Sequence, residues 1–171
     1  MWKPANSFCL PEALMNSNAA LKGWLPIIHQ KQLNRADCLV ACVLMILNYL
    51  DYPATSEQIT RLFDMDPDLG VPASRIKRLE QWGLHILYVS GTMNDLRQHL
   101  AQKEPCIAFV NTIHLPYWDE MTRHALVVSG IDEHYVYLND PFFDEAPQSV
   151  THLEFMLAWD EFENTYAVIS K

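Results

Sequence analysis

The fold of this chain is decided by the stretch Gln32-Leu-Asn-Arg-Ala-Asp-Cys38-Leu-Val-Ala-Cys-Val-Leu-Met-Ile-Leu-Asn-Tyr-Leu50. Asp37 is a plausible N-cap, because a short polar side chain directly before an apolar run often caps the first turn of a helix. The run that follows is apolar on every face, and a helix of that kind is normally buried on all sides. The sequence therefore predicts a buried helix over 38–50 in the middle of the domain.

Two cysteines lie in this predicted helix at chemically different positions. Cys38 falls in the first turn, where unpaired backbone N–H groups and the helix dipole favour the thiolate and lower the thiol pKa. Cys42 lies one turn deeper, where apolar neighbours should keep the thiol neutral. Cys38 is thus a candidate nucleophile, although a cysteine in a buried helix is also commonly an inert, small apolar side chain.

A nucleophilic cysteine needs a base, and the base needs an orienting group. His124 opens the β-rich run His-Ala-Leu-Val-Val-Ser-Gly-Ile, and Asp140 closes the next β-rich run, where a proline turns the chain. If the runs 124–131 and 135–139 pair as a hairpin, the start of the first lies beside the end of the second, and His124 and Asp140 become neighbours. Each residue also has an ordinary interpretation, His124 as a hydrogen-bonded strand residue and Asp140 as a turn former.

Acyl transfer also requires hydrogen-bond donors for the developing oxyanion. The backbone N–H of Cys38 is one candidate, because it lies at the start of the helix. Gln32, six residues earlier, offers a side-chain amide if the intervening loop folds back; its ordinary interpretation is an exposed surface residue.

The rest of the sequence predicts an α+β domain, because helical patterns come first and β-rich runs follow. Residues 1–24 show little periodicity and are expected to form an irregular N-terminal arm, so the domain spans 25–171. The helix over 72–82 should turn Ile76, Leu79 and Trp82 inward, and the pattern over 150–162 rests on Leu153, Met156, Leu157 and Trp159. The expected helices are 38–50, 55–65, 72–82, 92–102 and 150–162, and the expected strands are 84–89, 105–111, 124–131, 135–139 and 165–169.

Composition excludes several classes of function. The chain has 171 residues, a length typical of one domain, and a net charge of −9 from 12 basic and 21 acidic residues. Nearly all of this charge lies in residues 132–171, where nine acids face one lysine, which argues against general binding of nucleic acid or anionic membranes. The five glycines are too dispersed for a phosphate-binding loop, and no metal or organic cofactor is implied.

The N-terminal residues lack the apolar core of a secretory signal, and the longest apolar run is too short to span a bilayer, so a cytoplasmic location is expected. The four cysteines should then be reduced thiols. Cys38 and Cys42 are four residues apart with no second cysteine pair, which makes a zinc-ribbon or thioredoxin site a weak interpretation.

The segment from Gln32 to Leu50 resembles the first motif of the bacteriocin-processing peptidase family, which consists of a glutamine, an acidic-Cys pair and an apolar helix. The segment His124-Ala-Leu-Val-Val-Ser-Gly-Ile with Tyr-Val-Tyr-Leu-Asn-Asp140-Pro resembles its second motif. The family is known for papain-like cysteine peptidases that trim double-glycine leader peptides, often as domains of ABC transporters. The resemblance implies a papain-like fold, a helical half with the Cys38 helix packed on a twisted antiparallel sheet.

The same resemblance implies the role of each site residue. Cys38 is the nucleophile, His124 the general base and acid, Asp140 the orienting group and Gln32 the oxyanion donor. The family commonly has Gly-Pro after the nucleophile, whereas this chain has Leu39-Val40, so a bulky Leu39 should narrow the substrate channel. Transmembrane helices and ATPase motifs are absent from the sequence, which predicts a stand-alone member.

The expected activity is hydrolysis of a peptide or isopeptide bond in a peptide or protein substrate through a thioester. Tyr117 and Trp118, in the aromatic loop before His124, are candidates for a substrate-binding wall together with Leu39. The acids Asp144 and Glu145 beside the predicted cleft suggest attraction for a basic segment of the substrate.

Other functions fit the same residues. One is deamidation or transamidation by the same triad, for instance in a toxin-like effector. A second is a catalytically inactive binding module that keeps the fold. A third is a redox sensor that uses Cys38 and Cys42.

Overall fold

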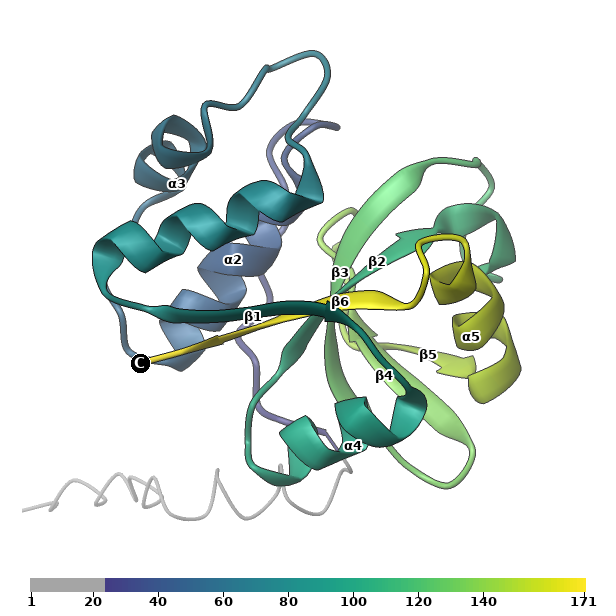
Figure 1. Cartoon of the computed structure of the whole chain (residues 1–171). Helices are drawn as coiled ribbons and strands as arrows, with labels where there is room; N and C mark the ends of the chain where they lie inside the picture. Colours follow the sequence, from purple (N-terminus) through teal and green to yellow (C-terminus); the bar gives the residue numbers. More distant parts are fainter. Residues whose placement is uncertain (1–23) are drawn as a thin grey trace, which may run out of the picture.

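The computed structural model describes residues 24–171, so nearly all of the predicted N-terminal arm lies outside the described residues. A six-stranded antiparallel sheet forms the centre, with the strand order β1-β6-β2-β3-β4-β5. Helices cover both faces of this sheet (Figure 1). The helices are α2 (Cys38–Tyr49), α3 (Ser56–Phe63), η1 (Ala73–Trp82), α4 (Met93–Ala101), η2 (Thr112–His114) and α5 (His152–Asp160), and the strands are β1 (His85–Ser90), β2 (Cys106–Asn111), β3 (Arg123–Ile131), β4 (Tyr135–Asn139), β5 (Gln148–Thr151) and β6 (Thr165–Ser170).

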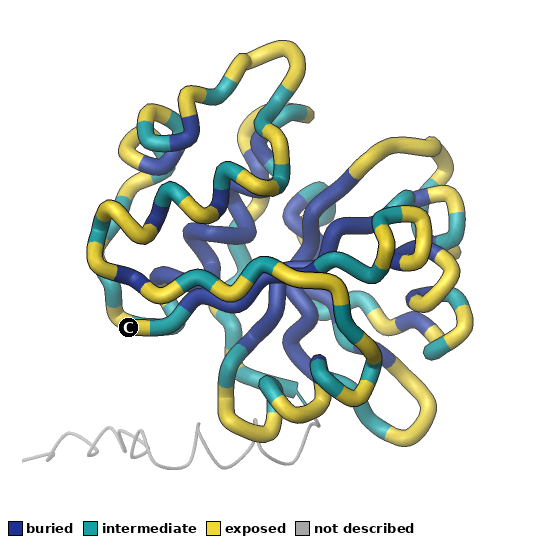
Figure 2. Tube along the Cα trace, viewed as in Figure 1, coloured by how far each residue is buried: buried dark blue, intermediate teal, exposed yellow. Residues whose placement is uncertain are grey.

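The predicted central helix is α2, and the nine consecutive residues from Leu39 to Leu47 are all buried. Figure 2 shows α2 as a dark blue segment enclosed between the other helices and the sheet. Helices α3 and η1 cover its outer side, and their buried side chains are Ile59, Phe63, Ile76 and Leu79. The domain therefore has the expected helical half, assembled around the helix that begins at Cys38.

The sheet separates two hydrophobic cores, because successive side chains of a strand point to opposite faces. On β2, Ile107 and Phe109 face the α2 core, whereas Ala108 and Val110 face the core under α4 and α5. The hairpin of β3 and β4 forms as predicted, with Val127 opposite Asn139. This pairing brings the start of β3 next to the end of β4.

Two predicted elements differ from the structure. The segment 72–82 is a 3-10 helix rather than an α-helix, and its inward residues Ile76, Leu79 and Trp82 are indeed spaced by three, the 3-10 repeat. The helix predicted over 150–162 begins only at His152, because residues 148–151 form β5 on β4. Within α5, Trp159 is buried, but Leu153, Met156 and Leu157 are exposed, and Phe155 and Ala158 fill the core in their place.

Candidate active site

Cys38 is the first residue of α2. No side chain of the described residues caps the N-terminus of this helix, so its backbone N–H groups and its dipole can stabilise a negative charge on the sulfur. Asp37 occupies the N-cap position, but its carboxylate makes no capping bond and instead accepts hydrogen bonds from the backbone N–H and the side chain of Asn34, both at 2.9 Å. Burial raises the pKa of the Cys38 thiol, but hydrogen bonding to His124, the charge of His124, and the backbone N–H groups of Ala125 and Leu39 outweigh burial and hold the pKa below its ordinary value.

His124, at the start of β3, connects the cysteine to the carboxylate. Its Nε2 hydrogen bonds Asp140 Oδ1 at 2.7 Å, so the opposite ring nitrogen, Nδ1, is the one available to Cys38. Burial lowers the pKa of His124, but the hydrogen bonds and charges of Asp140 and Cys38 raise it to about 9. A lowered thiol pKa beside a raised imidazole pKa favours a thiolate–imidazolium pair.

Asp140 follows β4 and is completely buried. Burial raises the pKa of its carboxyl, but the hydrogen bond and charge of His124, the Phe142 backbone N–H and the Trp118 indole N–H hold the pKa below its ordinary value. The carboxylate is therefore charged at neutral pH in spite of its burial, which is the state needed to hold an imidazolium.

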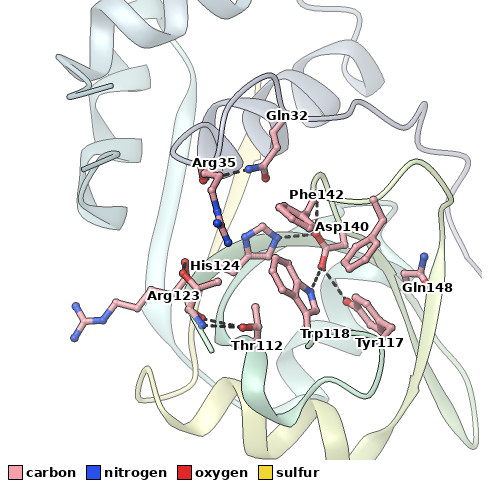
Figure 3. A network of polar contacts seen from close by, with 12 residues as sticks. Gln32, Arg35, Thr112, Tyr117, Trp118, Arg123, His124, Asp140, Phe142 and Gln148 are labelled. Carbon is pink, nitrogen blue, oxygen red and sulfur yellow. Dashed lines mark hydrogen bonds and ion pairs between the residues drawn. The ribbon is translucent and has the colours of Figure 1, made fainter. Parts of the chain in front are cut away.

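Gln32 is buried in the loop before α2, in contrast to a surface glutamine. Its backbone N–H donates to the Pro141 carbonyl at 2.8 Å, which ties this loop to the turn that carries Asp140. The Gln32 amide Nε2 donates to the carbonyls of Asn34 and Arg35 at 2.8 and 3.2 Å, while its Oε1 is buried without a partner (Figure 3). An oxyanion bond from Nε2 therefore requires the amide to give up one of these loop carbonyls.

A groove of about 1110 Å3 runs past the sulfur between the helical half and the sheet. Cys38, Leu39 and His124 line it, and the predicted contact of Leu39 with substrate stays a prediction. Tyr117 and Trp118 do not belong to this lining; both bind Asp140 instead, as Figure 3 shows. Their predicted role as a substrate wall stays a prediction.

The family model of the peptidase C39 family matches residues 25–167. The chain belongs to the peptidase C39 family. Together with solved relatives of the same fold, this membership makes it a cysteine peptidase. The predicted resemblance to bacteriocin-processing peptidases and the predicted papain-like α+β fold are both confirmed.

Solved C39 structures share the fold at low sequence identity. A C39-like peptidase from Bacillus anthracis is 15% identical with a TM-score of 0.69, over 85% of this chain and 95% of that one. A double glycine motif protease from an AMS/PCAT transporter, solved with its leader peptide, is 21% identical with a TM-score of 0.67, over 87% and 94%. The peptidase domain of Streptococcus ComA, a bifunctional ABC transporter, is 15% identical with a TM-score of 0.67, over 83% and 96%. The search of curated proteins returned no match.

The other described cysteines of this C39 peptidase differ from Cys38. Burial raises the pKa of Cys42 well above its ordinary value, with a contribution from the charges of Cys38 and Asp140. Burial raises the pKa of Cys106 to about 12. All three described cysteines are free thiols, and Cys9 lies outside the described residues.

The acidic residues of the groove do not come from the acidic segment 132–171, where the sequence concentrates its negative charge. Three aspartates of the segment 64–68 line the groove, together with three arginines, whereas Asp144 and Glu145 do not. Asp144 forms an exposed ion pair with Lys31 at 2.8 Å, and neither residue lines the groove. In the part of the chain that the structure describes, no helix is long and apolar enough to cross a membrane.

Proposed function

We propose that this C39 peptidase hydrolyses a peptide bond through a thioester, with Cys38 as nucleophile, His124 as general base and acid, and Asp140 as the orienting group. The observation that carries the proposal is the connection of the three side chains across two halves of the fold, with the sulfur at the groove and the His124–Asp140 bond of 2.7 Å behind it. Such a chain of nucleophile, base and orienting group is the arrangement that activates a thiol for acyl transfer.

In the first step the Cys38 thiolate attacks the carbonyl carbon of the scissile bond, and the carbonyl oxygen takes the negative charge. The His124 imidazolium then gives its proton to the leaving amine, which departs as the new N-terminus and leaves a thioester on Cys38. Neutral His124 next removes a proton from water as the oxygen attacks the thioester, which releases the new C-terminus as a carboxylic acid that gives its proton to solvent. The sulfur leaves as thiolate, and His124 keeps the proton, which restores the starting ion pair.

The oxyanion requires donors at the beginning of α2. The backbone N–H of Cys38 is one, because the first helical N–H groups have no partner within the helix. We assign the second donor to the Gln32 amide, which is buried beside this helix start and whose loop is fixed to Pro141. The amide would exchange one loop carbonyl for the oxyanion, a stronger acceptor because it is charged.

The proposed substrate is a peptide segment in extended contact with the groove, comparable in class to the leader peptide in the AMS/PCAT protease complex. Apolar residues Leu39, Tyr88, Phe109 and Phe162 line part of the groove and suit apolar side chains. Asp64 is paired with Arg75 at 3.6 Å, so Asp66 and Asp68 are the groove aspartates that favour a basic residue of the substrate beside the segment 64–68. Raising the salt concentration should then raise the KM of a basic substrate more than that of a neutral one.

The test is cleavage of a peptide library by the wild type and by Cys38→Ala, followed by mass spectrometry. Cys106→Ala is the matched control, because it removes a buried thiol that lies outside the groove. Fragments that disappear in Cys38→Ala alone support the proposal. A gain of one dalton without fragments would indicate deamidation instead, and slow alkylation of Cys38 at about pH 6 with no product would indicate a binding module.

A further inference from the structure

The Asp140 carboxylate receives four hydrogen bonds although it is completely buried. One oxygen, Oδ1, accepts from His124 Nε2 at 2.7 Å and from the Phe142 backbone N–H at 3.0 Å. The other oxygen, Oδ2, accepts from the Trp118 indole N–H at 2.9 Å and from the Tyr117 hydroxyl at 3.1 Å. The His124 bond is thus one of four that hold the carboxylate, and both hydrogen bonds to the second oxygen come from Tyr117 and Trp118.

The loop that supplies these two donors is closed at its base. The Thr112 hydroxyl donates to the Glu120 carbonyl at 2.6 Å and accepts from the Thr122 backbone N–H at 2.9 Å. Leu115 of this loop is buried in the core under α4 and α5, and its carbonyl accepts from the Trp118 backbone N–H at 3.0 Å. These bonds fix the backbone that places the two aromatic residues.

Ring contacts fix the side chains as well. The Trp118 ring packs on Phe142 at a centroid distance of 4.5 Å, and the Tyr117 ring meets Phe143 edge-on at 5.2 Å. Trp118 also stands edge-on to the His124 ring at 5.0 Å (Figure 3). The donors of Oδ2 are therefore immobilised by the same turn that carries Asp140, and one of them covers the imidazole.

We propose that Tyr117 and Trp118 are positioning residues that lock the Asp140 carboxylate so that Oδ1 points at His124. This inference rests on the proposed function, because it assigns their role through Asp140 and His124 rather than through contact with substrate. A carboxylate can rotate about its bond to the Cβ atom; two fixed donors on Oδ2 remove that freedom and satisfy an oxygen that burial would otherwise leave without a partner. The predicted substrate wall thus acquires a different role behind the catalytic histidine.

The consequence for proton transfer follows from the groups around the pair. The titratable groups that act on Asp140 and His124 are Cys38 and Cys42 of α2 and Tyr117 of the loop. Burial and the charge of Asp140 raise the pKa of Tyr117 well above its ordinary value, so the hydroxyl remains a donor over the working range of pH. When Oδ2 loses a donor, Asp140 binds His124 in less favourable geometry, the imidazolium is less stable, and the thiolate of Cys38 loses its partner.

The experiment measures the rate of Cys38 alkylation by iodoacetamide against pH in the wild type, Tyr117→Phe and Trp118→Phe. Each variant keeps an aromatic ring and loses one donor to Oδ2. We expect the pH of half-maximal alkylation to rise by roughly half a unit or more, and kcat per active site to fall about tenfold with KM nearly unchanged. Tyr137→Phe is the matched control, because it also removes a hydroxyl bond to an aspartate, Asp132, away from the groove.

If Tyr117 and Trp118 only stabilise the fold, the variants should give less folded enzyme, but the alkylation midpoint and the kcat per titrated active site should not change. That result in Tyr117→Phe and Trp118→Phe would overturn the inference. The proposed function fails separately, when wild-type Cys38 is alkylated no faster than Cys106 at about pH 6 and no peptide is cleaved. The alkylation midpoint decides the positioning role with or without an identified substrate.

Discussion

Asp140→Asn is the perturbation that tests the charge of the site most directly. The amide keeps the shape of the carboxylate, but it removes the negative charge behind His124 and places an N–H group where Oδ2 now accepts from Trp118 and Tyr117. The indole N–H cannot become an acceptor, so one buried donor loses its partner, and we expect a stability loss of ~1–3 kcal/mol. Circular dichroism before each assay establishes that the variant is folded.

The larger effect is on the ion pair. The pKa of His124, lowered by burial and raised by Asp140 and Cys38, stands at about 9 against an ordinary value of 6.5, which corresponds to ~3 kcal/mol in favour of the imidazolium at about 1.4 kcal/mol per pH unit. The Asp140 hydrogen bond is the first of the causes that raise this pKa, and a hydrogen bond to a charged group contributes about 1.5–3 kcal/mol, so we take ~2 kcal/mol for it. Loss of that amount lowers the equilibrium ratio of the thiolate–imidazolium pair to the neutral thiol–imidazole pair by about 30-fold.

The assay is the rate of Cys38 alkylation at about pH 6, followed by peptide mass spectrometry. Asp132→Asn is the control, because it makes the same change of charge at an aspartate that also accepts several hydrogen bonds, outside the groove. If folded Asp140→Asn is alkylated within about threefold of the wild-type rate, Asp140 does not stabilise the ion pair and the reasoning is refuted.

Three further predictions concern the surroundings of Cys38. Cys42 should remain unlabelled while Cys38 is fully alkylated near neutral pH, because burial raises the pKa of Cys42; equal labelling of the two thiols in mass spectra would contradict this. Leu39→Ala should lower the free energy of urea unfolding by ~2–4 kcal/mol and leave the alkylation midpoint of Cys38 unchanged, because Leu39 reaches the sulfur through its backbone N–H. Gly70→Ala should lower Tm more than Gly83→Ala, since both have a φ near +80° but only at residue 70 does a new methyl meet a backbone carbonyl, at 3.3 Å; equal losses of Tm would show that this contact has no cost.

The sequence predicted best those elements whose local hydrophobic pattern matches their place in the folded domain. The run after Asp37 is apolar on every face, and only a helix enclosed by the rest of the domain satisfies that pattern, so α2 was predictable to within one residue. The β3–β4 hairpin was predictable because its two runs are β-rich and separated by a short turn. The pairing of these runs then placed His124 beside Asp140.

Prediction failed where a short element depends on its partner. Strand β5, Gln-Ser-Val-Thr, has one apolar residue in four, and its pairing with β4, in which Val150 lies opposite Val136, makes it a strand. The Thr151 capping box with Glu154 was a local signal for the true start of α5, and its use would have moved the helix start from 150 to 152. The residues on which the helical pattern over 150–162 rested are mostly exposed for a related reason. The sequence alone does not show that Phe155 and Ala158, rather than Leu153 and Leu157, face the core, because that depends on the position of the sheet.

The contacts of Tyr117 and Trp118 show why a candidate site is harder to complete than a fold. Strand alternation puts His124 and Leu126 on one face of β3, and Leu138 and Asp140 on the same face at the end of β4. Because Val127 pairs with Asn139, one further step of the register places Asp140 opposite Leu126, diagonal to His124. A slip of one residue would send Asp140 to the other face, so the register itself fixes this contact.

The loop that carries Tyr117 and Trp118 is not paired with the strand before Asp140. Its closure by Thr112 and Thr122 brings the two donors to Oδ2. The His124–Asp140 pair is therefore encoded in the hairpin, whereas the donors to Oδ2 are encoded in a loop whose path the sequence pattern does not determine.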